Sequence, residues 1–221
     1  MRPPTAAAVA ALLLALAGCT GDEGDGTVPE ADRLLAAAAG EMADVQSVRL
    51  RLSADANVAE LPVRQVEAQV TRDGDAAGTA QVEQLGQRLE VSFVVVGDEF
   101  HYRLLGDWQQ GTRADAAGLY DPSAILGPDG GVANLLRTAT AAEVDGDEEI
   151  DGTATHRVTA RFDPAAVAAL LPGAPDGLTG TLWIGVDRPL LHQARFELPD
   201  GGGPVTVRLY DHDAPAQISA P

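Results

Sequence analysis

Lysine is absent from this sequence, and its 15 arginines stand against 33 acidic residues, which gives a formal net charge of −18. A chain this acidic is repelled by nucleic acids and by anionic membrane surfaces. Nucleic acid is therefore excluded as a partner, and attraction to anionic lipid through charge alone is not expected.

Cysteine occurs once, at Cys19, and aromatic residues make up only 4% of the chain. A single cysteine cannot form an internal disulfide, so the protein must fold without one. With so few aromatic side chains, the hydrophobic interior has to come from Val, Leu and Ala. The length is enough for one domain with a sizeable core.

Recognisable catalytic and metal-binding motifs are also missing. There is no Gly-x-Ser-x-Gly motif, and the histidines at 101, 156, 192 and 212 are not spaced as metal ligands. Residues 145–151 superficially resemble a calcium loop, but Ile150 stands where the EF-hand requires glycine, and a charged turn explains them better. We expect no catalytic residue, no metal, no cofactor and no enzymatic activity.

The N-terminus carries the pattern of an export signal. Arg2 is followed by an uncharged apolar run, Ala6–Ala17, which is shorter than the roughly 20 residues needed to span a bilayer. The junction Leu16-Ala17-Gly18-Cys19 resembles the lipobox of bacterial lipoproteins, in which the cysteine is lipidated after cleavage. We predict an exported protein that is anchored through Cys19 to the outer face of the cell membrane; a plain secretory signal is the alternative.

Composition divides the chain into four parts. Residues 1–18 are the predicted signal peptide, and residues 19–29 are the lipidated cysteine and a small, acidic tether. Residues 30–211 are the predicted domain, and residues 212–221 are a predicted loose tail.

Periodicity predicts an α+β domain. Apolar residues at helical spacing predict a helix over 29–45, and alternation of apolar and polar residues predicts antiparallel strands before and after a helical insert at 119–139. The strands are predicted at these ranges: 48–53, 66–71, 78–84, 87–96, 100–105, 141–150, 153–162, 178–186, 190–198 and 204–211. A short helix is predicted at 164–171. Helices on one face of an antiparallel sheet are typical of this pattern.

The apolar faces of these strands are long and aliphatic, as in Leu89, Val91, Phe93 and Val95. An antiparallel sheet usually buries one face. An ordinary packed core and a lined cavity both explain such a face, and periodicity does not separate them.

Several segments resemble the LppX/LprA/LprF/LprG lipoproteins of mycobacteria and related actinobacteria, and in particular the LprG-like branch. They are residues 61–63, residues 92–98, Trp108, the stretch from Leu119 to Leu136 with its Tyr-Asp-Pro motif, residues 151–152, and residues 182–184. The resemblance extends over most of residues 30–211.

That resemblance implies a fold similar to LolA and LolB: a strongly curved antiparallel half-barrel whose concave face is covered by helices, enclosing an apolar cavity. It also implies carriage of multi-acylated lipids across the cell envelope. The implied cargo is a triacylated glycolipid, such as a mannosylated phosphatidylinositol or a related lipoglycan, or triacylglycerol. A carrier could hand that cargo to a membrane lipid transporter.

On this basis we select candidate functional residues. Those expected to line the lipid cavity are Leu34, Leu35, Leu50, Leu52, Val91, Phe93, Val95, Leu182, Ile184 and Phe196. Trp108 and Tyr120 are candidates for the mouth or lid, although either could simply anchor the helical insert. Any of the lining residues could instead be plain core.

Two observations leave the function open. The chain is more acidic than a binder of anionic inositol lipids is expected to be, so neutral triacylglycerol, or a glycolipid recognised by its sugars, fits more easily. The same fold could also serve an envelope sensory module that binds a protein partner, because fold does not fix function.

Overall fold

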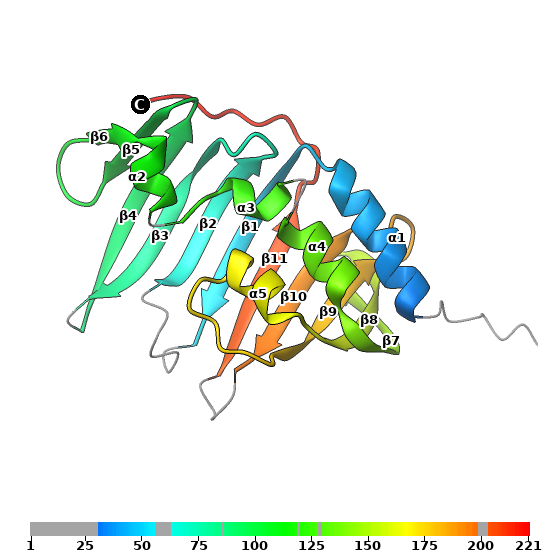
Figure 1. Cartoon of the computed structure of the whole chain (residues 1–221). Coiled ribbons are helices and arrows are strands. Elements are labelled where there is room, and N and C mark those ends of the chain that lie inside the picture. Colours follow the sequence, from blue (N-terminus) through cyan, green and yellow to red (C-terminus); the bar gives the residue numbers. More distant parts are fainter. Residues whose placement is uncertain (1–30, 56–62, 85, 119, 128–129, 199–202) are drawn as a thin grey trace, which may run out of the picture.

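A computed structural model describes residues 31–55, 63–84, 86–118, 120–127, 130–198 and 203–221 (Figure 1). The predicted signal, Cys19 and the tether lie outside the described residues. Within the described part the chain forms eleven strands and five helices, and the α+β prediction is confirmed.

All eleven strands belong to one sheet, ordered β6-β5-β4-β3-β2-β1-β11-β10-β9-β8-β7, and the neighbours are antiparallel. The chain builds it as two meanders that meet where β1 pairs with β11. The strands are β1 (Ser47–Ala54), β2 (Val63–Thr71), β3 (Ala76–Gln84), β4 (Gln87–Val96), β5 (Glu99–Arg103), β6 (Gln109–Thr112), β7 (Thr140–Ile150), β8 (Thr153–Arg161), β9 (Thr179–Gly185), β10 (Leu191–Glu197) and β11 (Pro204–Tyr210).

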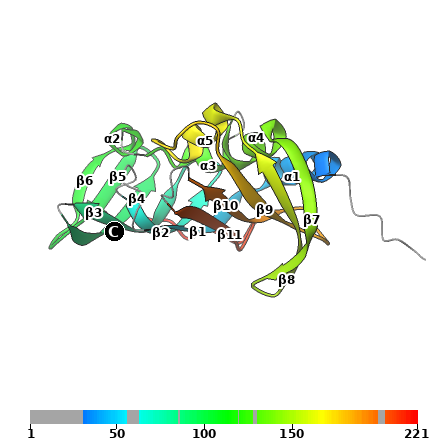
Figure 2. The same cartoon turned by 90° about the horizontal axis from the view of Figure 1, so that it is seen from below.

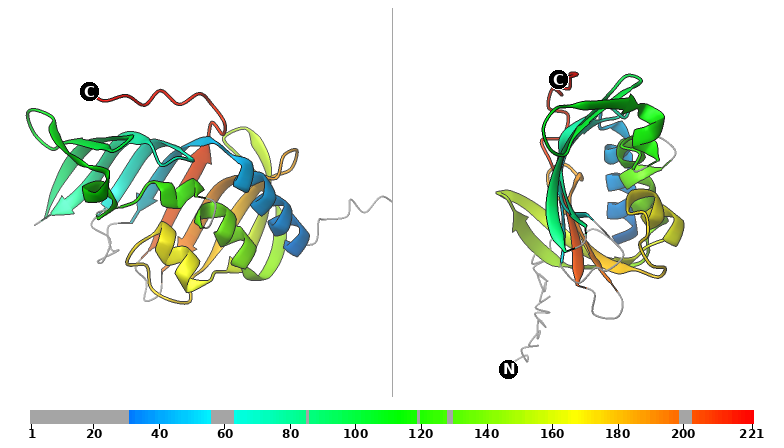
Figure 3. Two further views of the ribbon diagram at one scale, coloured as in Figure 1. Left: turned by 45° about the horizontal axis from the view of Figure 1, so that its top comes forward. Right: turned by 90° about the vertical axis from the view of Figure 1, so that its left-hand side faces the viewer.

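The sheet is strongly curved, and the helices lie on its concave side (Figures 2 and 3). They are α1 (Ala31–Asp44), α2 (Arg113–Ala117), α3 (Ser123–Leu126), α4 (Gly131–Thr138) and α5 (Pro164–Leu170). The predicted half-barrel with a helical cover on its concave face is confirmed. The connection from β6 to β7, which are the two edges of the sheet, carries α2, α3 and α4 across that face.

Local sequence accounts for where the short helices begin. Asp163 caps α5 by accepting a hydrogen bond from the Ala166 backbone N–H at 3.0 Å, and Pro164 occupies the first turn. Thr112 and Asp115 form a capping box at the start of α2. In each case the cap satisfies backbone donors that the first helical turn leaves unpaired.

Two elements were not predicted. β6 is entirely polar and lies at the edge of the sheet, so it lacks the alternation that marks a half-buried strand. α2 follows it directly. The strand predicted at 100–105 ends at Arg103, because the chain turns there into the hairpin that leads to β6.

The described hydrophobic core lies between Ala31 and Leu209 and has two parts. The larger part joins α1, α3, α4 and α5 to the concave face of the sheet. The smaller part is Val95, Phe100 and Ala116, beneath α2. Phe93 packs against both. A chain that starts at residue 30 therefore carries the whole described core.

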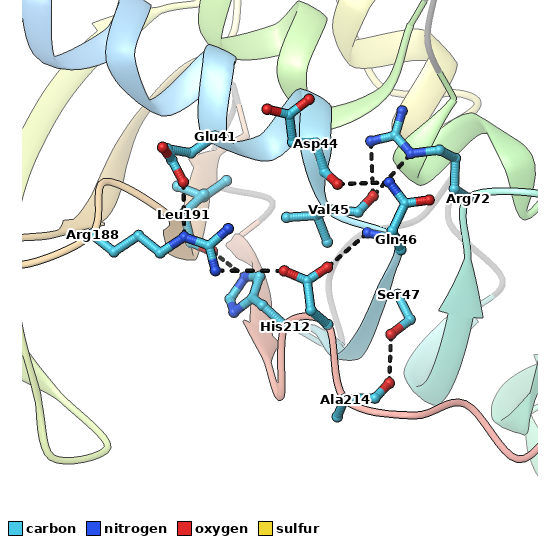
Figure 4. A network of polar contacts seen from close by, with 11 residues as sticks. Glu41, Asp44, Val45, Gln46, Ser47, Arg72, Arg188, Leu191, His212 and Ala214 are labelled. Atoms are coloured by element: carbon cyan, nitrogen blue, oxygen red, sulfur yellow. Dashed lines mark hydrogen bonds and ion pairs between the residues drawn. The ribbon is translucent and has the colours of Figure 1, made fainter.

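The C-terminal segment was predicted to be loose, and the structure differs for its first residues. Asp213 Oδ1 accepts from the Gln46 backbone N–H at 2.8 Å, and the Ser47 hydroxyl donates to the Ala214 carbonyl at 2.6 Å. His212 Nε2 donates to the Leu191 carbonyl at 3.1 Å (Figure 4). Each of these contacts joins residues that lie far apart in the sequence, so the composition of the tail could not predict them.

The same network holds the end of α1. Arg188 pairs with Glu41 of α1 at 2.8 Å and with Asp213 of the tail at 3.5 Å. The Arg72 guanidinium donates to the Val45 carbonyl (Figure 4). It also donates to the Ala43 carbonyl, at the end of the helix where the dipole favours a cation.

This tail should make stability depend on pH. Burial, and then the neighbouring His192 ring, lower the pKa of His212 to about 4, whereas Asp213 raises it and Arg188 lowers it. The unfolded chain therefore binds a proton at His212 below about pH 6.5, whereas the folded chain binds it only below about pH 4. The contribution of His212 to the free energy of unfolding is fully present above pH 6.5 and is lost as the pH falls toward 4.

We expect His212→Gln, which keeps a donor but does not titrate, to remove part of this loss. Between pH 7.5 and pH 5 the free energy of unfolding of the wild type should fall by about 2 kcal/mol more than that of the variant. Urea unfolding at both pH values measures the difference. Equal pH slopes in the two proteins would contradict the role given to His212.

Candidate functional site

Strand pairing aligns one row of apolar side chains across eight strands on the concave face. Each pair of neighbours in the row is set by the register of the sheet. In order from β8 to β4, the row is Val158, Leu182, Ala194, Val207, Leu52, Val66, Ala80 and Val91.

Exposure changes along this row. Val158 and Leu182 are fully buried and Ala194 is 3% exposed, whereas every residue from Val207 to Val91 is only partly buried. Residues of α1, α4 and α5 share one core cluster with the buried end of the row. In Figure 1 the same three helices lie over the β7–β11 half of the sheet. We call the partly buried members, Val207, Leu52, Val66, Ala80 and Val91, the apolar strip.

The residues predicted to line a cavity divide between the packed core and the apolar strip. Seven of them are at most 6% exposed and belong to the packed core: Leu34, Leu35, Leu50, Val95, Leu182, Ile184 and Phe196. Phe196 also packs edge to face against Phe162, with ring centroids 5.2 Å apart. Leu52 and Val91 lie in the strip, and Phe93 is half-buried on the same face of β4 as Val91.

Sequence reasoning missed the middle of the strip. Val66 and Ala80 are its members on β2 and β3, and Val207 joins them from β11. The alternation in these strands shows which side chains share a face. It does not show that Val66 lies between Leu52 and Ala80, because that follows from strand order and register.

Tyr120 anchors the crossing segment. Its hydroxyl donates to the Leu170 carbonyl at the end of α5 at 3.3 Å, and burial raises the pKa of the phenol. The Tyr120 ring packs against the main core. Of the two roles weighed from the sequence, the contacts of Tyr120 fit an anchor.

Trp108 lies elsewhere, in the β5–β6 hairpin near the edge of the sheet. It is half-buried, and the Arg103 guanidinium lies over its ring, 4.9 Å from the centroid. The structure therefore does not bring Trp108 and Tyr120 together at one mouth.

The outer, convex face of the sheet is polar. Two shallow hollows of about 330 and 430 Å³ lie on this face. Most of their lining residues alternate with the strip residues along the same strands, which places them on the side of the sheet opposite to the strip. The first contains Arg64, Arg88 and Asp55, and the second contains Arg51, Glu67 and Glu90. Exposed ion pairs such as Arg51–Glu67, at 3.1 Å, are typical of this face and contribute little to stability.

Within the described ranges, no three His, Cys, Asp or Glu side chains gather as metal ligands would. Nor does any helix in that part of the chain combine the length and the hydropathy needed to cross a membrane. The strip is a partly exposed apolar feature of the concave face, and a ligand could contact it.

The division between core and strip can be tested by truncation. Leu182→Ala should lower the free energy of unfolding by about 2–5 kcal/mol, because it leaves a cavity beneath the helices. Val91→Ala should cost under about 1 kcal/mol, since its side chain is already partly in water. Urea unfolding of both variants measures this. Equal losses would mean that the strip is packed as tightly as the core.

The chain is similar in sequence to a known family of lipoproteins and to named members of it. Residues 30–218 match the family described as LppX_LprAFG lipoprotein. The lipoarabinomannan carrier protein LprG of Mycolicibacterium smegmatis is 33% identical over 219 residues, covering 97% of this chain and 92% of that protein. LprG of Mycolicibacterium hassiacum is 32% identical, covering 100% of this chain and 99% of that protein.

Two crystal structures share the fold. LprF from Mycobacterium bovis superposes with a TM-score of 0.79 at 24% identity, covering 88% of this chain and 98% of LprF. LppX from Mycobacterium tuberculosis does so with a TM-score of 0.65 at 23% identity, covering 86% of this chain and 100% of LppX. The family match and the carrier relatives confirm the resemblance drawn from the sequence, and the chain belongs to the LppX_LprAFG family of lipoproteins.

Proposed function

We propose that this protein is a membrane-anchored carrier that holds the acyl chains of a lipid on its apolar strip and moves the lipid within the cell envelope. The strip is the observation that carries the proposal. It is a row of aliphatic side chains across five neighbouring strands that remain partly exposed in a folded domain. Relatives named lipoarabinomannan carrier protein support the same reading.

The energetics explain why such a strip is needed. Leaving a 16-carbon acyl chain in water costs on the order of 12 kcal/mol, at about 0.8 kcal/mol per CH₂. A carrier recovers that energy if it presents apolar side chains to most of the chain length. Aliphatic side chains such as Val66 and Leu52 offer no hydrogen bond, so they contribute to binding only by burying acyl chain.

The proposal includes binding without catalysis and anchoring through Cys19 at the outer face of the cell membrane. Multi-acylated glycolipid and triacylglycerol are the proposed cargo classes. The net charge of −18 favours a neutral lipid, or one that is recognised by its sugars, over an anionic phospholipid.

Lipid occupancy is tested with a soluble form that comprises residues 30–221, whose folding is checked by cooperative urea unfolding. It is produced in a host that makes mannosylated inositol lipids and triacylglycerol, and is examined by native mass spectrometry. We expect a near-stoichiometric mass increment that lipid analysis identifies as a multi-acylated lipid.

Two variants locate the bound lipid. Val91→Trp places a large ring in the strip and should abolish the mass increment. Glu90→Trp, the matched control, adds the same ring on the opposite face of β4 and should leave lipid bound. Wild-type protein that purifies without lipid would contradict the carrier and favour a sensory module that binds a protein partner.

A further inference from the structure

Two of the three exposed large hydrophobic residues in the described part of the chain are neighbours in one hairpin. Leu105 is 79% exposed and Leu104 is 40% exposed, and the two follow directly after β5, in the β5–β6 hairpin. The third large exposed hydrophobic residue is Val186, at 45%, in the turn between β9 and β10. We call Leu104, Leu105 and Trp108 the hairpin tip. Neighbouring exposed leucines are unusual enough to suggest a contact surface.

Register connects this tip to the apolar strip. The last pair between β4 and β5 joins Ser92 to Arg103, and these two residues directly adjoin Val91 in β4 and Leu104 after β5. Val91 is the last residue of the strip. The tip therefore begins one residue beyond the strand pair that adjoins the outer end of the strip, near one edge of the sheet.

The tip also has the composition of a membrane-interface element. Its two leucines are flanked by Trp108, whose ring packs under the Arg103 guanidinium at 4.9 Å. Tryptophan favours the boundary between hydrocarbon and water, and arginine can keep its charged end in water while its stem covers apolar surface. A hairpin of this kind can bury its leucines in a bilayer and leave its polar groups at the surface.

The charge of the hairpin also favours a lipid bilayer as the partner of the tip. The protein as a whole is repelled by an anionic surface, but the charged residues of the segment 103–108 are one Arg103 and one Asp107, which cancel. Contact with a membrane at this place therefore has to be apolar rather than electrostatic.

We propose that the hairpin tip inserts into the surface of a lipid bilayer and that acyl chains enter the apolar strip from there. The second half of this proposal rests on the carrier function, whereas the first half does not. The tip thus serves as the contact through which the carrier meets the membrane.

Docking is tested first, with the soluble form of residues 30–221 and vesicles of zwitterionic phosphatidylcholine. We expect flotation of the protein with the vesicles, and quenching of Trp108 fluorescence by phosphatidylcholine brominated on its acyl chains. Trp183, which is 7% exposed and donates to Glu148 at 2.8 Å, serves as an unquenched internal reference. Added phosphatidylglycerol should weaken binding.

Two variants assign the contact. Leu104→Ser combined with Leu105→Ser should lower the vesicle partition coefficient at least about tenfold, equivalent to about 1.4 kcal/mol. Val186→Ser removes the other exposed large hydrophobic side chain and should leave the partition unchanged. Both changes are in exposed loops, so neither should affect folding.

Several outcomes would overturn docking by the tip: no wild-type binding, equal binding by the double serine variant, or an equal loss in Val186→Ser. Self-association of the wild type that the double variant abolishes, without any vesicle binding, would instead make the tip a contact between copies.

Transfer is tested second, as the rate at which a fluorescent triacylglycerol moves between vesicles. The double serine variant should purify with as much lipid as the wild type but transfer it at least about tenfold more slowly. Vesicle binding without co-purified lipid would refute the carrier and leave docking intact. Co-purified lipid without vesicle binding would refute only docking, and an unchanged transfer rate would refute entry at the tip.

Discussion

The constraint on which this architecture depends is that β6 and β7, consecutive strands in the chain, are the opposite edges of one eleven-stranded sheet. The connection between them has to cross the whole sheet, and it does so on the concave side. It places α2 over β4–β6 and α4 against α1 and α5. The cover is consequently uneven, because α1, α4 and α5 gather on one half and leave the strip residues of β1–β4 partly exposed.

Polar contacts hold the first part of this crossing. The Arg113 guanidinium at the start of α2 donates to the Gly97 carbonyl and pairs with Asp75, which ties the helix to the turns before β3 and after β4. Tyr120 then ties the chain to α5 through Leu170. Held at these points, the crossing segment can leave the strip open without losing the packing of α4.

The sequence predicted individual elements better than it predicted the site. Alternation predicted both ends of β4 correctly and the ends of most other strands within three residues. It could do so because apolar and polar residues alternate along a half-buried strand. α2 was missed although Thr112 and Asp115 have the spacing of a capping box. Leu182 and Val91 have the same pattern, yet one is fully buried and the other is not. That difference depends on which helices lie above them, and the half-barrel itself was predicted only through the family resemblance.

The net charge of −18 is compatible with the proposed membrane contact, because that contact lies in a segment without net charge. Electrostatic repulsion is screened over about 8 Å at physiological ionic strength, so only charges near the point of contact oppose docking. The ion pairs of Arg51 and Arg195 with glutamates occupy the convex face, and the hairpin tip carries no net charge. The proposed contact would therefore bring apolar side chains, rather than acidic ones, against the lipid. Because the net charge opposes non-specific adsorption to anionic lipid, the proposed contact through the tip would be brief and reversible, as the proposed carrier function requires.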